Sequence, residues 1–357
     1  MAPKFESRSM QLRPRGAQLT NLINSRFCVE PQRLTVTPST DLAGKTAIIT
    51  GGNTGLGLHA AHHLLSLQLT RLILAVRSPE KGEAAAARLR QDFPSARIDV
   101  WTLDMSSYPS IQAFARRVAD TTETPRIDIA ILNAGMHLTD LTLNPSTGHD
   151  EVIQVNYLST MLLAVLLLPA LKASTLRQGN PQQPSRLTIV NSGLALAATL
   201  PNRDKRPLLK SFDDTAITPY SGQDRYSTSK LLAHLFFARL QDHLPSADHV
   251  VVSLVDPGYC KGSSLLRDSR GAEKVIFGAL EKVLGRTLDD GAWTYVDAVV
   301  VKGKESHGCY LMDWTIKSFA AQVYEPAFQD SIDALWEETL DEFKFAGARE
   351  ILQSIKN

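Results

Sequence analysis

Cysteine is scarce in this sequence, and neither sign of charge predominates. Cys28, Cys260 and Cys309 stand far apart among 357 residues, which indicates a reducing compartment and predicts neither a disulfide framework nor a metal site. The formal net charge of +1 gives no support to a nucleic-acid partner. The pair His62 and His63 has no further ligand at metal-binding spacing. We therefore expect a cytoplasmic protein that binds no metal.

Long hydrophobic runs, internal repeats and low-complexity linkers are also lacking. The most apolar run starts at Met161, is interrupted by Pro169 and is shorter than the ~20 residues that a bilayer requires. We expect no membrane span, and interpret this run as a buried helix or a subunit contact. Residues 1–42 carry basic side chains, few acids and no apolar signal core, and we interpret them as an N-terminal extension.

From residue 45 onward, short apolar runs alternate with longer amphipathic ones. The apolar runs are continuous and rich in β-branched residues, as in strands covered on both faces; they span 45–50, 71–76, 97–103, 127–132, 186–191 and 249–254. The helical patterns lie over 57–67, 79–92, 109–119, about 150–173 and 226–243. The alternation predicts an α/β fold of the Rossmann type, a doubly wound parallel sheet in one domain over 43–357. An edge strand at 308–312 and helices within 270–302 and 324–355 complete the prediction.

A glycine-rich turn follows the first expected strand and opens a helix. The segment "TGGNTGLG" covers residues 50–57. Its glycines permit positive φ and a close approach of the backbone to a pyrophosphate, which binds the amides at a helix N-terminus. This placement after a strand predicts a dinucleotide site, with contacts from Gly51, Asn53, Thr54, Gly55, Leu56 and Gly57.

The end of the second expected strand indicates which dinucleotide binds. An acid there favours NAD, whereas a cation accepts the 2′-phosphate of NADP. The segment "LILAVRSPEK" has no acid at the strand end but carries Arg77, Ser78 and Lys81. Guanidinium and hydroxyl groups suit a phosphate, so we expect NADP(H); a solvated arginine is the alternative.

Two further strand ends carry residues suited to the adenosine half. Asp104 and Met105 close the third expected strand, where the carboxylate can accept from the adenine amine and the Met105 amide can meet the ring. Asp104 can equally be the N-cap of the next helix. Asn133, Ala134 and Gly135 close the fourth strand, where small residues let the backbone pass close to a cofactor or simply make a turn.

Tyr226 and Lys230 are the only tyrosine–lysine pair four residues apart in the chain. On a helix this spacing puts both side chains on one face. An ammonium near a phenol lowers the pKa of the phenol, as carbonyl reduction by a proton donor requires. Tyr220 has no such lysine and lies in a loop-like segment.

A serine and an asparagine strengthen this interpretation. Ser192 ends the fifth expected strand, at the edge where doubly wound sheets bind ligands, and its hydroxyl can donate to a developing alkoxide. Asn156 falls inside an expected helix, a poor place for asparagine. It can hold the helix backbone open and bind a water, or it is a mildly unfavourable residue without a role.

Together these motifs resemble the short-chain dehydrogenase/reductase family, in particular its retinol-dehydrogenase-like members and the reductases of fungal secondary metabolism. The resemblance covers residues 43–312 and is carried by "TGGNTGLG", "LDMSS", "NAG", "VNYLS", "YSTSK" and "DPG". It implies Tyr226 as general acid/base, Lys230 as its tuning residue and ribose ligand, and Ser192 as the carbonyl-oxygen donor. It also implies that Asn156 positions a water. Pro257 and Gly258 then line the nicotinamide end, and Asn133 lies beside the adenosine ribose.

The chain departs from the family pattern in three places. "NSG" replaces the usual serine pair, so a register slip would put Gly193 in the catalytic place instead of Ser192. The threonine expected after "PG" is missing, and Ser263 or Ser264 is the substitute, if there is one. The loop 193–224 is long and carries Leu194, Leu196, Phe212 and Tyr220. We expect this loop and the segment 258–290 to shape the substrate pocket.

These observations predict an NADP(H)-dependent oxidoreductase that interconverts a ketone or aldehyde and an alcohol on a medium-sized apolar substrate. A catalytically silent NADP-binding scaffold or sensor and an NAD-linked alcohol dehydrogenase are the alternatives. The resemblance implies a homodimer formed through the helices at 150–173 and 226–243, but a buried helix explains the apolar run equally well.

Overall fold

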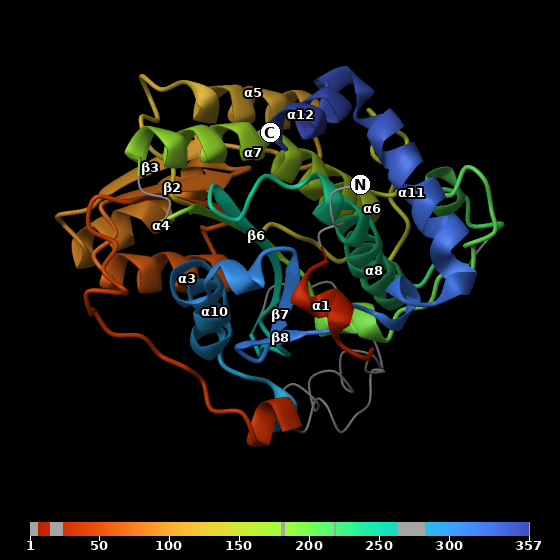
Figure 1. Cartoon of the computed structure of the whole chain (residues 1–357), viewed down its shortest axis with the longest axis horizontal. Coiled ribbons are helices and arrows are strands. Elements are labelled where there is room, and N and C mark those ends of the chain that lie inside the picture. Colours follow the sequence, from red (N-terminus) through yellow and green to blue (C-terminus); the bar gives the residue numbers. More distant parts are fainter. Residues whose placement is uncertain (1–5, 15–23, 180–182, 218, 263–282, 357) are drawn as a thin grey trace.

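Eight strands form one continuous sheet in the computed structural model (Figure 1). The structure describes residues 6–14, 24–179, 183–217, 219–262 and 283–356. The strand order is β3-β2-β1-β4-β5-β6-β7-β8, and all neighbours pair in parallel except β7 and β8. The bounds are β1 Thr46–Thr50, β2 Arg71–Val76, β3 Arg97–Thr102, β4 Ile129–Leu132, β5 Ser185–Val190, β6 Val250–Asp256, β7 Cys309–Met312 and β8 Thr315–Lys317. The predicted doubly wound parallel sheet is confirmed, and the antiparallel β8 is an addition that the sequence did not suggest.

Helices cover both faces of the sheet (Figure 1). They are α1 Arg8–Gln11, α3 Gly55–Ser66, α4 Pro79–Asp92, α5 Tyr108–Ala119, α6 Glu151–Ile153, α7 Thr160–Gln178, α8 Gly222–Leu240, α10 Leu288–Val296, α11 Gln329–Glu342 and α12 Ala348–Ile355. Two segments are π-helical, Gln154–Ser159 and Asp297–Val301. Short 3-10 turns lie at Gly193–Leu196, Leu209–Phe212, Gln241–His243, Lys304–Ser306, Ala321–Val323, Pro326–Phe328 and Lys344–Ala346. Residues 263–282, part of the helical region expected over 270–302, lie outside the described residues.

Alternate residues of each strand supply two separate cores. In β1, Ile48 packs into the core that also holds α5, α7, α8, α11 and α12. Ala47 and Ile49 on the same strand pack into the core beneath α3, α4 and α10. Because successive strand side chains point to opposite faces, both sets must be apolar when both faces are covered. This double burial is the physical reason why the strands appear in the sequence as continuous apolar runs.

The apolar run from Met161 belongs to a core helix. The helical segment Glu151–Gln178 is 28 residues long and apolar enough to cross a membrane by length and composition, but 89% of its most apolar window is buried inside the fold. Pro169 stands within α7, as the helix expected over about 150–173 requires, and the helix continues to Gln178. α12 packs against α7, and α11 packs against α8. The buried-helix interpretation therefore accounts for the run without a partner subunit.

The N-terminal extension contacts the domain at several places. α1 lies against β7 and β8, where the Ser9 hydroxyl donates to Lys317 O and accepts from Tyr310 N. Farther along, Val29 and Leu34 pack on the core beneath α3 and α10, and Arg33 pairs with Asp290 at 2.8 Å. The described part of the extension is thus tied to β7, β8 and α10.

Candidate active site

The glycine turn lies between β1 and α3, at the carboxyl edge of the sheet. Gly51 and Gly55 have φ of +65° and +56°, a region that side chains other than glycine rarely adopt. A Cβ on Gly57 would lie 2.6 Å from Asn133 Nδ2 and 2.7 Å from Gly51 O, so this position must stay without a side chain. Only glycine therefore allows α3 to begin so close to the end of β4.

The turn fits the diphosphate of a dinucleotide. Thr54 precedes α3 without a side-chain cap, and the first turn of α3 contains no acid, so its amides remain available to an anion. No described residue comes within 4 Å of a Cβ placed on Gly55, so these residues leave the space in front of the amides open. Asn53 and Leu56 flank this opening and are half-buried.

The predicted NADP-selecting residues gather after β2. Arg77 and Lys81 are exposed, and neither side chain makes a hydrogen bond or ion pair within the part of the chain that the structure describes. Ser78 is the N-cap of α4, where its oxygen accepts from Lys81 N at 3.4 Å. Among the described residues, no acceptor is bonded to the hydroxyl hydrogen of Ser78. Two cations and one hydroxyl thus surround the start of α4.

Asp104 is not the helix N-cap that the sequence allowed as one of its two roles. It does not cap α5, because Ser107 is the N-cap and accepts from Ser110 N. Asp104 Oδ1 instead accepts from Ser106 N at 3.0 Å and closes the turn after β3. A cleft of about 420 Å³ borders Asp104 and reaches Met136 after β4. The carboxylate therefore faces a space in which an adenine amine could lie, beside the buried Met105.

The segment after β4 connects the glycine turn to the tyrosine helix. Asn133 Nδ2 donates to Thr50 O at 3.0 Å, and Ala134 N donates to the Thr50 hydroxyl at 2.9 Å. A Cβ on Gly135 would lie 3.9 Å from the ammonium of Lys230. The small residues predicted here thus allow the glycine turn and the helix that carries Tyr226 and Lys230 to lie close together.

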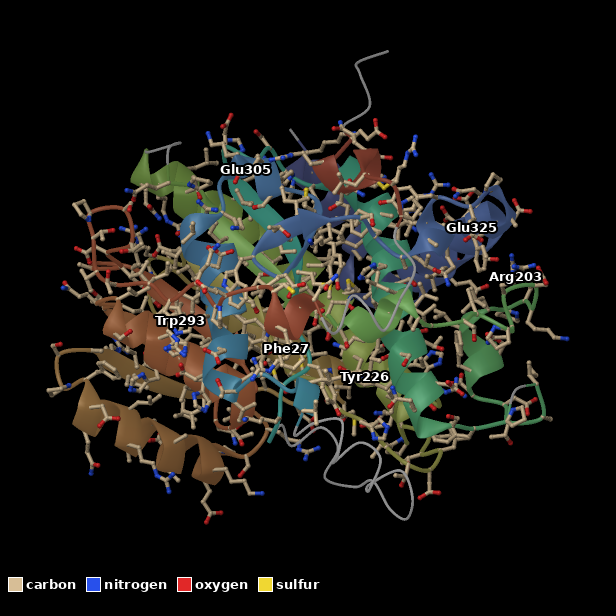
Figure 2. The ribbon with its side chains drawn as sticks, turned by 90° about the horizontal axis from the view of Figure 1, so that it is seen from below. Phe27, Arg203, Tyr226, Trp293, Glu305 and Glu325 are labelled. Atoms are coloured by element: carbon tan, nitrogen blue, oxygen red, sulfur yellow. The ribbon has the colours of Figure 1, made fainter. Side chains whose placement is uncertain are left out.

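Tyr226 lies in the first turns of α8 and is buried (Figure 2). Its phenol is hydrogen-bonded to the hydroxyl of Ser192, which directly follows β5. Gly193 faces the other way, since a Cβ there would lie 3.0 Å from Asp256 Oδ2. Of the two register alternatives, the structure places Ser192 beside Tyr226. Tyr220 precedes α8, outside the helix, and donates to Leu138 O.

Lys230 is buried one helical turn beyond Tyr226. Its ammonium lies 5.8 Å from the centroid of the Tyr226 ring and donates to Val190 O at 2.9 Å. Burial lowers the pKa of Lys230 to about 8, and the charge of Asp256 opposes this shift. The ammonium is therefore held inside the protein, on the same side of α8 as the phenol.

The pKa of Tyr226 departs from the expectation. Burial raises it above its ordinary value, the hydrogen bond from Ser192 opposes this, and the charge of Asp256 adds to the rise. The expected lowering by Lys230 does not appear, because desolvation of a phenolate outweighs an ammonium that is bonded to a backbone carbonyl. The phenol is consequently protonated at neutral pH, which is the form that donates a proton to a carbonyl.

Asn156 stands in the π-helical segment Gln154–Ser159. Its Oδ1 accepts from Met136 N and its Nδ2 donates to Met136 O, both at 2.8 Å, while Nδ2 also reaches the Ser229 hydroxyl. A π-helical turn opens the helix backbone and occurs often at functional sites. The expected opening is present, and the side chain fixes it to the segment after β4 and to α8.

Several residues around this site gave no signal in the sequence. The His137 ring lies 6.1 Å from the Tyr226 ring. The buried Arg286 donates to Pro257 O at 3.4 Å, to Ser25 O at 2.7 Å and also to Asp313. Such contacts join segments far apart in the chain, so no local pattern reveals them.

Two expectations about the pocket concern particular side chains. Phe212, on the loop expected to shape the pocket, is buried in the core and packs beside Arg225. Ser263 and Ser264, the expected substitutes for the threonine, lie outside the described residues. Gly258 has φ +77° and packs against Arg286, which closes the end of the site formed by Pro257 and Gly258.

The arrangement agrees with comparisons to known proteins. A family model described as short chain dehydrogenase matches residues 45–180. A short chain dehydrogenase/reductase of Annulohypoxylon moriforme, mfmJ, is 52% identical over 319 residues, 89% of this chain and 90% of that protein. The chain belongs to the short-chain dehydrogenase/reductase family. This dehydrogenase/reductase is also 40% identical over 344 residues to a short-chain dehydrogenase of Aspergillus ruber, fogG, covering 95% of this chain and 96% of that protein. The family supports an oxidoreductase that acts on a small molecule.

Solved structures share the fold of this dehydrogenase/reductase. A Pseudomonas aeruginosa RhlG/NADP active-site complex has a TM-score of 0.58 at 20% identity, covering 81% of this chain and 100% of that one. A 3-ketoacyl-(acyl-carrier-protein) reductase from Brucella melitensis, complexed with NADH, has a TM-score of 0.56 at 18% identity, covering 76% and 97%. These neighbours bind a nicotinamide cofactor of one type or the other, and at such identities they show the fold alone.

Proposed function

We propose that the protein is an NADP(H)-dependent reductase that converts a ketone or aldehyde on a medium-sized, largely apolar substrate into an alcohol. The observation that carries the proposal is the hydrogen-bonded pair of Tyr226 and Ser192 beside the buried ammonium of Lys230. Two hydroxyls meeting at one point can both bind the oxygen of a carbonyl. The relatives from fungi favour a substrate of secondary metabolism.

Each residue has a role that follows from its contacts. NADPH, when bound, would supply the hydride for the carbonyl carbon. Tyr226, protonated at neutral pH, donates its proton to the carbonyl oxygen as negative charge develops there. Ser192 donates a hydrogen bond to the same oxygen. Lys230 supplies positive charge that stabilises the tyrosinate left behind, and Asn156 keeps the opened helix backbone in place for a water that returns the proton.

The cofactor is proposed to lie along the edge of the sheet from Asp104 to Gly258. Gly51, Gly55 and Gly57 would receive its diphosphate, and Asn133 would lie beside its adenosine ribose. Arg77 would pair with the 2′-phosphate, because its guanidinium is exposed and suits phosphate geometry. This charge, with no acid at the end of β2, favours NADP(H) over NAD(H).

The proposal is tested with purified protein, NADPH and a panel of ketones and aldehydes, by following the loss of the reduced nicotinamide. We expect turnover with bulky apolar carbonyl compounds. Tight NADPH binding without turnover of any compound would favour the silent scaffold instead.

Cofactor choice is tested by charge reversal in Arg77→Glu. We expect NADPH affinity to fall ~10- to 100-fold, the worth of one lost charge-assisted pair, while NADH affinity stays the same or rises. Arg88→Glu, a reversal at an exposed site farther along α4, serves as the control and should change neither affinity. Equal effects of Arg77→Glu on both cofactors would contradict the NADP assignment and favour the NAD-linked alternative.

A further inference from the structure

Asp256 is a carboxylate buried at the centre of the site, and the reaction described above gives it no role. It ends β6, directly before Pro257, and only 2% of it is exposed. Among the described residues it forms no ion pair. A buried carboxylate without a paired cation is costly unless it is well hydrogen-bonded, so its hydrogen bonds indicate what it does.

Three donors from three different elements converge on this carboxylate. Gly258 N donates to Oδ1 at 3.0 Å, and the Tyr310 hydroxyl donates to Oδ2 at 3.4 Å. The backbone amide of Gly193 donates as well. Gly193 follows Ser192 after β5, and Gly258 belongs to the loop after β6. One side chain thus connects the loop of the carbonyl-binding serine to the loop at the nicotinamide end.

The close fit around the carboxylate supports this connection. A Cβ on Gly193 would lie 3.0 Å from Oδ2, and Gly258 takes a φ of +77° that other residues rarely adopt. Glycine at both positions lets the two backbones come within hydrogen-bonding distance of the same side chain. The sequence "NSG", a departure from the family pattern, therefore gains a physical explanation.

We propose that Asp256 is a positioning residue, whose carboxylate holds the Ser192 loop and the Gly258 loop in one fixed frame. It touches neither substrate nor cofactor and acts through the two backbone amides. The inference rests on the proposed function, since it assumes that these loops flank a nicotinamide and a carbonyl. With the carboxylate in place, the Ser192 hydroxyl and the end of the cofactor site keep a constant separation.

The charge of Asp256 also acts on its surroundings. Burial raises the pKa of Asp256 to about 6, and the Gly258 amide opposes this. Above that pH Asp256 is charged, and its charge raises the pKa of Lys230 against the lowering caused by burial. Titratable groups from several elements face Asp256. They are Tyr226 and Lys230 on α8, Cys260 after β6, Arg286 before α10, Tyr295 on α10, Tyr310 on β7 and Asp313 after β7.

The sign of the pH dependence follows from these shifts. As the pH falls through about 6, Asp256 takes up a proton and loses one acceptor site, so the amides of Gly193 and Gly258 are held less well. NADPH affinity and turnover should both decline on this acid side. As the pH rises through about 8, Lys230 loses its charge, and turnover should decline again.

The test is Asp256→Asn, which keeps the shape and removes the charge. The control is Asp297→Asn, another buried carboxylate, paired with Lys302 at 2.9 Å at the far end of α10. NADPH affinity is measured by fluorescence titration from about pH 5 to about pH 9, which requires no turnover. We expect Asp256→Asn to bind NADPH ~10-fold more weakly at neutral pH, because a hydrogen bond to a charged group contributes about this much. The variant should also lose the acid limb, that is, the decline of NADPH affinity as the pH falls through about 6. Asp297→Asn should melt at a lower temperature but keep the wild-type pH profile.

A milder variant covers the case in which Asp256→Asn does not fold. Tyr310→Phe removes one donor, so it should raise the pKa of Asp256 and move the acid limb to higher pH. An acid limb that is unchanged in both variants, or missing from the wild type, would overturn the inference. NADPH binding with the expected acid limb but no turnover of any carbonyl compound would leave the inference standing and refute the proposed function.

Discussion

Replacing Tyr226 by phenylalanine removes one oxygen and leaves the buried ring in place. The ring is 6% exposed and lies at the edge of the packed α8. The lost hydrogen bond to Ser192 costs about 1 kcal/mol of folding free energy, so we expect Tyr226→Phe to fold. Its effect on turnover should therefore report on chemistry rather than on stability.

The expected loss of rate follows from two contributions of the phenol. General acid catalysis by a positioned side chain contributes ~10²- to 10⁴-fold, and a lost oxyanion donor costs ~10²- to 10³-fold. The two act on the same oxygen and are not additive, so we expect kcat to fall ~10³- to 10⁴-fold. NADPH affinity should change little, because Lys230 and the glycine turn are untouched.

The assay combines steady-state turnover with NADPH titration for wild type, Tyr226→Phe and Tyr324→Phe. Tyr324 is the control, since its hydroxyl donates to Ser9 O at 2.6 Å and has no place in the proposed site. The reasoning would be refuted by a Tyr226→Phe enzyme with kcat within ~10-fold of wild type, or by an equal loss in Tyr324→Phe.

Three further predictions concern the glycine turn, the extension and a buried histidine. Gly57→Ala should abolish tight NADPH binding in a titration, because the added Cβ has no room. Unchanged affinity would contradict the proposal that the glycine turn receives the diphosphate. Ser25→Ala should weaken NADPH binding ~3- to 10-fold, since the Ser25 hydroxyl bonds to Arg286 and Asp313 behind the Pro257 loop. A lower melting temperature with unchanged NADPH binding would show that this contact only stabilises the fold. His149 is buried, which lowers its pKa, but hydrogen bonds to Asp213 and Glu342 outweigh this and raise it to about 9 from 6.5. Its stabilising contribution is complete below pH 6.5 and is lost as the pH rises through about 9, so chemical denaturation should show a decline that His149→Gln lacks.

Most of the fold was predictable because the sheet is covered on both faces. β2 Arg71–Val76 and α4 Pro79–Asp92 begin and end where the sequence placed them, since double burial and a Ser78 cap leave local signals. β8 was not predictable, because its three residues carry no periodicity. Pro169 lies inside the expected helix, and the packing of α7 between α5, α12 and β5 tolerates it.

The site was predictable to the extent that its residues stand at strand ends or at helical spacing. Ser192, Tyr226 and Lys230 met these conditions, and the structure brings them together. The buried environment was not predictable: a motif gives no measure of desolvation, so the pKa of Tyr226 moves opposite to the expectation. Asp256 and Arg286 were missed because their partners lie on other elements, and only the folded chain brings these elements together.

The most direct test of the central claim is a crystal structure of the protein with NADP and a bound ketone. The account predicts the ketone oxygen within hydrogen-bonding distance, ~2.6–3.2 Å, of both the Tyr226 phenol and the Ser192 hydroxyl. A ketone oxygen that binds elsewhere while the nicotinamide lies beside Gly258 would contradict it.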